Sequence, residues 1–103
     1  MKNELYKLIH NDYFETSNDF KQFLNWLSNE FVLYQQEDIN GLKVFFPNGY
    51  FFINELNHNK NSIQLRIEVK SKCLKNGTQI FNQIKSILNH SKIFQTQKLQ
   101  LAV

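Results

Sequence analysis

Glu68 and Lys70, in the stretch SIQLRIEVKSK, are the residues of this chain whose types and spacing could do chemistry. Apolar and polar residues alternate strictly here, as in a strand with one buried face. Both side chains would lie on the polar face, roughly 7 Å apart along the strand. A carboxylate can bind Mg²⁺, and a lysine can stabilise the charge that develops during phosphodiester hydrolysis. Such a site needs a second carboxylate, and Glu55, near the end of YFFINEL, is the candidate.

The stretch IEVKSK, after a hairpin with an acid near the end of its second strand, resembles the PD-(D/E)xK nuclease superfamily. The resemblance extends over residues 18–103, with one extra strand at 31–36. It implies a core of order α-β-β-β-α-β, Glu55 and Glu68 as ligands of Mg²⁺, and Lys70 as the catalytic lysine. The chain departs from the family pattern at INEL, where a glutamate follows an asparagine in place of the usual aspartate.

The same residues have an alternative interpretation, an ion pair on the solvated face of an ordinary strand. The loop between 50–56 and 62–70 is short, so these strands are expected to pair directly. Glu55 then lies opposite residues 62–64, about 15 Å from Glu68 at ~3.4 Å per residue. Two carboxylates share a Mg²⁺ only if an oxygen of each comes within about 2.0–2.1 Å of one point. We therefore expect a solvated pair, with no catalytic residues and no cofactor.

Charge is divided unevenly along the chain. Residues 1–56 contain eight acids and four lysines, a net charge of −4. Residues 57–103 contain one acid, seven lysines and one arginine, a net charge of +7. The basic half could meet an anionic partner, or the two halves could attract each other within one fold. Because Arg66 is the only arginine, attraction to nucleic acid would be mostly independent of base sequence.

Hydrophobic periodicity predicts the elements that must position these residues. Three helices are expected, at residues 5–9, 18–31 and 78–89. Five strands are expected, at residues 31–36, 42–46, 50–56, 62–70 and 98–103. Turns are expected at 47–49 and at Asn76-Gly77. The result is a single α+β domain over residues 1–103, of order α-α-β-β-β-β-α-β, with one sheet of four to five mainly antiparallel strands.

The middle hairpin carries aromatic residues on both faces. Either helices cover both faces, or one face stays open for a partner. The candidate binding residues are its rings and the basic side chains that follow: Phe45, Phe51, Lys70, Lys72, Lys75, Lys85 and Lys92. The single cysteine excludes an internal disulfide, and no apolar run approaches the ~18 residues of a membrane span, so a cytoplasmic location is expected.

These features favour a small non-enzymatic binding protein, such as an inhibitor, an immunity-type protein or a regulatory partner of a larger protein or complex. We expect a protein as its partner, and a homodimer is compatible with the sequence. Two alternatives remain open. One is the Mg²⁺-dependent nuclease, and the other is a sequence-tolerant nucleic-acid-binding protein that uses the basic C-terminal half.

Overall fold

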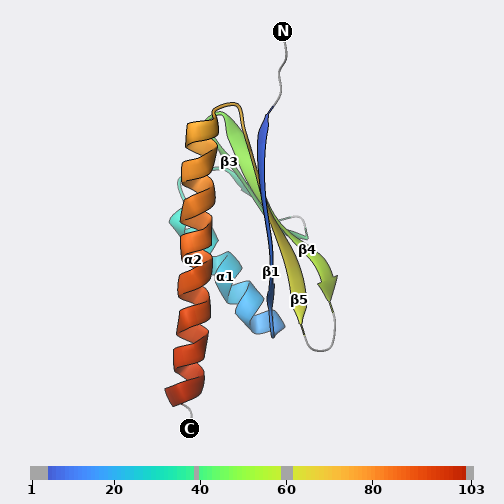
Figure 1. Cartoon of the computed structure of the whole chain (residues 1–103), viewed down its shortest axis with the longest axis vertical. Coiled ribbons are helices and arrows are strands. Elements are labelled where there is room, and N and C mark those ends of the chain that lie inside the picture. Colours follow the sequence, from blue (N-terminus) through green and yellow to red (C-terminus); the bar gives the residue numbers. More distant parts are fainter. Residues whose placement is uncertain (1–4, 39, 59–61, 102–103) are drawn as a thin grey trace.

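The computed structural model describes residues 5–38, 40–58 and 62–101, with the side chains of all of these except 57, 58 and 97–101. The elements in chain order are β1 (Tyr6–Phe14), α1 (Ser17–Glu30), β2 (Gln36–Glu37), β3 (Gly41–Phe46), β4 (Gly49–His58), β5 (Ile63–Ser71) and α2 (Leu74–Leu101). The strands form one antiparallel sheet of spatial order β1-β5-β4-β3-β2. Figure 1 shows α2 running the length of the molecule, with α1 beside it on the same side of the sheet.

One face of the sheet and both helices make the core. The alternating apolar residues of β5 are fully buried, and β1 and β4 pair with it on either side. The helices contribute apolar residues at helical spacing, which places them on one stripe of each helix. The buried stripe residues are Phe20, Phe23 and Leu27 of α1 and Ile80, Ile84 and Leu88 of α2. Both helices therefore cover the same face of the sheet.

The predicted order of elements is wrong, and the N-terminal helix is the first error. Residues 5–9 do not form a helix, because β1 occupies Tyr6–Phe14 and pairs with β5 along its whole length. A helix of so few residues has little stability of its own, since the first turn is costly to form. Pairing with a strand more than fifty residues away decides the conformation.

The predicted strands at 31–36 and 98–103 are also wrong. Phe31 is the C-cap of α1, and only Gln36 of the first range lies in a strand. The Gln36 side chain donates to the carbonyls of Ser28 and Phe31 and so closes the end of the helix. Nothing ends α2 early, because no proline or glycine follows Gly77 before Leu101. The remainder of the second range, 102–103, lies outside the described residues.

The observed order is β-α-β-β-β-β-α, with one sheet and two helices. The predicted elements at 18–31, 42–46, 50–56, 62–70 and 78–89 correspond to α1, β3, β4, β5 and part of α2. The predicted turn at Asn76-Gly77 lies inside the first turn of α2. A Cβ on Gly77 would come 2.9 Å from the Ser71 Cβ, so glycine allows the start of α2 to pack on the end of β5. None of the helices in the described ranges is long and apolar enough to cross a membrane.

Candidate functional site

The sheet face opposite the helices, called the outer face below, is the candidate site. It comprises the outward side chains Lys7, Ile9, Asn11, Tyr13, Glu37, Lys43, Phe45, Tyr50, Phe52, Asn54, Gln64, Arg66, Glu68 and Lys70. Strand pairing sets these residues in rows across the sheet, because directly paired residues share a face. The first row is Lys7, Lys70, Tyr50 and Phe45. The second is Ile9, Glu68, Phe52, Lys43 and Glu37, and the third is Asn11, Arg66 and Asn54.

No helix of the described ranges packs on the outer face (Figure 1). Ile9 and Tyr13 are 45% and 53% exposed, and the rings of Phe45, Tyr50 and Phe52 are partly exposed. The aromatic hairpin allowed either helices on both faces of the sheet or one uncovered face. The fold has one uncovered face.

Glu68 and Lys70 form an ion pair within these rows. The Glu68 carboxylate lies 3.7 Å from the Lys70 Nζ and 3.4 Å from the Lys7 Nζ, so two cations flank one acid. A hydrogen bond with Tyr50, together with the charge of Glu68, raises the pKa of the Lys70 ammonium. These contacts therefore favour the charged form of Lys70.

Glu55 lies on the other side of the sheet from Glu68. It pairs with Leu65, whose side chain is buried on the helix side, whereas Glu68 pairs with Phe52 on the outer face. The strands at 50–56 and 62–70 do pair directly, as the short loop predicted. The fold thus does not bring together Glu55, Glu68 and Lys70. No group of three or more His, Cys, Asp and Glu residues in the described ranges could hold a metal ion.

Lysines and rings interleave on β3 and β4. The Lys43 Nζ lies 4.4 Å from the centroid of the Tyr50 ring and 5.1 Å from that of Phe45. The two ring centroids are 6.2 Å apart. Attraction between an ammonium and a ring holds such a side chain in place, by about 0.5–1 kcal/mol at an exposed site. The face therefore presents ordered cations and rings in alternation.

The other predicted binding residues are dispersed. Phe51 is fully buried and its ring packs on Phe31, 4.9 Å between centroids. Lys72 and Lys75 are exposed where β5 leads into α2. Lys85 lies on α2, with its Nζ 5.4 Å from the Phe81 ring centroid. The basic residues that the structure describes in the C-terminal half therefore do not form a single surface.

Sequence reasoning missed Lys7, Lys43, Tyr50 and Phe52 as members of the site. Lys7 and Lys43 belong to the acidic half of the chain, where counting charge by halves conceals them. The alternation in β3 and β4 was a usable signal, since it places Lys43, Tyr50 and Phe52 on the face opposite Phe51. Only the pairing of β1 with β5 adds Lys7.

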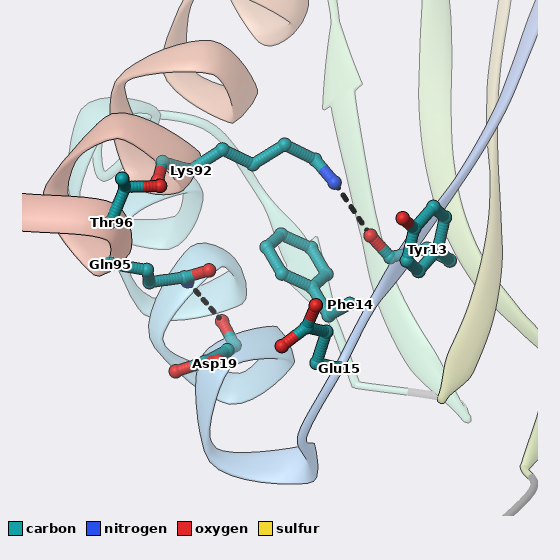
Figure 2. Close-up of a pocket in the computed structure, with 7 residues that line it drawn as sticks. All are labelled: Tyr13, Phe14, Glu15, Asp19, Lys92, Gln95 and Thr96. Carbon is teal, nitrogen blue, oxygen red and sulfur yellow. Dashed lines mark hydrogen bonds between the residues drawn. The ribbon is translucent and has the colours of Figure 1, made fainter. Parts of the chain in front are cut away.

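Lys92 acts on the helix side of the sheet. Its Nζ donates to the Tyr13 carbonyl at 2.6 Å and lies 2.9 Å from the Asp12 carboxylate. Figure 2 shows it reaching from α2 past the Phe14 ring to β1, beside a pocket of about 210 Å³. Partial burial alone would raise the pKa of Asp12, but contacts with Lys92, the Tyr13 N–H and His10 outweigh it and lower that pKa. This cluster attaches α2 to the edge strand.

The chain matches no protein-family model, and no curated protein matches it.

Proposed function

We propose that the protein is a small non-enzymatic binding protein whose binding surface is the outer face of its sheet. The packing of both helices on one face carries the proposal, because it leaves an aromatic and charged face uncovered. A face that serves only to meet solvent is expected to alternate to plainly polar residues. This one carries Phe45, Tyr50 and Phe52 on neighbouring strands, with Ile9 and Tyr13 more exposed at its edge.

Preorganisation supports the same function. Rings have few rotatable bonds, so little conformational entropy is lost when a partner immobilises them. Lys43 and Lys70 are already held by the Tyr50 ring and, for Lys70, by Glu68. A partner therefore meets side chains that are ordered in advance, which favours binding over a surface of free lysines.

The biological role that we infer is that of an inhibitor, immunity-type protein or regulatory partner of a larger complex. We also infer a cytoplasmic location. Cys73 is free and exposed, and such a thiol persists most readily where the surroundings are reducing.

The test compares two variants with matched changes. In the outer-face variant, Tyr50→Ser is combined with Phe52→Ser. In the control, Tyr34→Ser is combined with Phe94→Ser, two exposed rings on the loop after α1 and on α2. Each immobilised protein, checked for folding by circular dichroism, is incubated with extract of the source cells, and bound protein and nucleic acid are identified. The proposal requires a partner that wild type and control retain and the outer-face variant loses. Identical capture by all three would refute it.

A further inference from the structure

Resting on this proposed function, we propose that the outer face binds single-stranded nucleic acid, with bases stacked on its rings and phosphates beside its cations. Four cations and several rings share one uncovered sheet face, and this juxtaposition is the observation behind the inference. RNA and DNA single strands offer the same two chemical features, planar bases and a phosphate chain, and both are included in the test.

The outer face of the sheet carries more positive than negative charge. Among the described residues of the outer face, four are basic, Lys7, Lys43, Arg66 and Lys70, and two are acidic, Glu37 and Glu68. Glu68 offsets one of the two lysines that flank it, and the four cations against two acids leave these residues with a net charge of +2. On the helix side, Asp12 is paired with Lys92 and the Glu30 carboxylate accepts from Gln83. The outer face therefore attracts anions, although the N-terminal half of the chain is acidic.

The rings of the face suit a partner with planar groups. Tyr50 and Phe52 point to the same side of β4, roughly 7 Å apart at ~3.4 Å per residue, and Phe45 lies opposite Tyr50 on β3. Bases stack on aromatic side chains whatever their identity, since every base has a π face. Lys43 lies over the Tyr50 and Phe45 rings, which places its ammonium beside the rings on which bases would stack and near the phosphate that follows a stacked base.

Amide side chains at the other end of the face can read base edges. Asn11, Tyr13 and Gln64 line a hollow of about 340 Å³, together with Asp12, Leu56 and Leu65. Arg66 donates from its Nε to the Asn11 Oδ1 at 3.4 Å, which orients that amide. Asparagine, glutamine and arginine are the usual hydrogen-bonding partners of base edges. Because Arg66 is the only arginine, the expected base preference is weak.

The central position of the charges favours nucleic acid over a protein as the partner in direct contact with this face. The centre of a protein–protein interface is usually depleted of charged residues, lysine and glutamate among them. Here Arg66, Glu68 and Lys70 lie on β5, the second of five strands, with Lys43 two strands away. A second copy placed face to face would bring like charges together. A duplex hides its base faces, so only an unpaired strand can use the rings.

The test is fluorescence anisotropy with labelled single strands of about 12 nucleotides, within the range that single-strand-binding domains cover. Mixed-sequence RNA and DNA are titrated separately, with a duplex of the same sequence as competitor. Losing a base stack costs about 5- to 150-fold in affinity, so Tyr50→Ala with Phe52→Ala should weaken binding at least about tenfold. Tyr50→Phe keeps the ring and should bind as wild type does.

The salt dependence of binding distinguishes contacts made by the outer face from an effect of the protein's net charge. Lys43→Gln should lower the slope of log affinity against log salt by about 0.7, measured between about 50 and 200 mM. Lys21→Gln on the exposed side of α1 makes the same change in net charge and should leave the slope unchanged.

Four results would overturn the inference. The first two are no binding of either single strand up to about 100 µM, the weak end of non-specific affinity, and tighter binding of the duplex than of the single strands. The third is an equal slope of log affinity against log salt for Lys43→Gln and Lys21→Gln. The fourth is a loss of binding through Lys72→Gln with Lys75→Gln but not through the ring substitutions. If extract yields a protein that depends on the outer face while oligonucleotides fail to bind, the proposed function stands and this inference falls.

Discussion

Replacing Lys92 by methionine tests the cluster that joins α2 to the edge strand. Methionine keeps most of the apolar stem beside the Phe14 ring and removes only the ammonium. That ammonium makes two short contacts, to the Tyr13 carbonyl and to the Asp12 carboxylate. The change therefore leaves an edge carbonyl and a partly buried acid without their cation.

The expected cost follows from those two contacts. A hydrogen bond to a charged group is worth about 1.5–3 kcal/mol. The side chains of Asp12 and Lys92 are 21% and 34% exposed, so solvent weakens both contacts. We expect Lys92→Met to lower the free energy of unfolding by about 1–3 kcal/mol at neutral pH. In a double-mutant cycle with Asp12→Asn, the coupling should be about 0.5–2 kcal/mol.

Lowering the pH should reduce the difference in free energy of unfolding between wild type and Lys92→Met. The pKa of Asp12 is lower in the folded protein than its usual value of about 3.9. A carboxyl with a lowered pKa contributes stability above its unfolded pKa, and that contribution is lost as the pH falls through the folded pKa. The gap between wild type and Lys92→Met should therefore be full above about pH 5 and shrink below about pH 4.

The measurement is urea denaturation followed by the fluorescence of Trp26, the single tryptophan, at about pH 7 and about pH 3. Lys85→Met is the control, since the Lys85 ammonium lies over the Phe81 ring of its own helix. If Lys92→Met costs no more than Lys85→Met at neutral pH, or if its cost is the same at both pH values, the cluster does not stabilise the edge strand.

Three further outcomes are expected. Phe23→Ala should lower the free energy of unfolding, measured by chemical denaturation, by about 3–5 kcal/mol, and Ile84→Ala by about 2–5 kcal/mol. A loss of less than about 1 kcal/mol for both would place the apolar stripes of α1 and α2 outside the core. Gly77→Ala should destabilise the protein despite the higher helix propensity of alanine, because the added Cβ would crowd Ser71. A stabilised variant in the same denaturation assay would show that α2 can move away from β5 at little cost. Purified protein with Mg²⁺ should leave RNA and DNA intact on gels, and cleavage that Glu68→Ala abolishes would restore the nuclease hypothesis.

Elements with a complete local pattern could be predicted from the sequence. β5 alternates over its whole length because it is flanked on both sides and buried on one face. β1 could not be predicted, because its inward positions include His10 and Asp12, which interrupt the apolar alternation. Those polar residues are accommodated by each other and by Lys92, which approaches from a helix near the other end of the chain. No local window contains that partner.

The candidate site was predictable only in part, for the same reason. The strand pattern alone shows that Glu68 and Lys70 share a face, and spacing places Glu55 away from them. Which face the helices cover depends on packing between distant elements. The membership of Lys7 depends on the β1–β5 pairing, which brings residues about sixty positions apart into one row.

The two halves of the sequence differ in charge, but the fold does not place them on separate surfaces. Successive residues of a strand point to opposite faces, so a sheet sorts charge by face and not by position along the chain. Lys92 forms an ion pair with Asp12 on the helix side, as expected if the two halves of the chain attract each other. Lys7, from the acidic half, lies next to Lys70 on the outer face. Changes at Lys92 should therefore act on stability, and changes at Lys43 on binding. A Lys43→Gln variant that unfolds more easily but binds normally would contradict this separation.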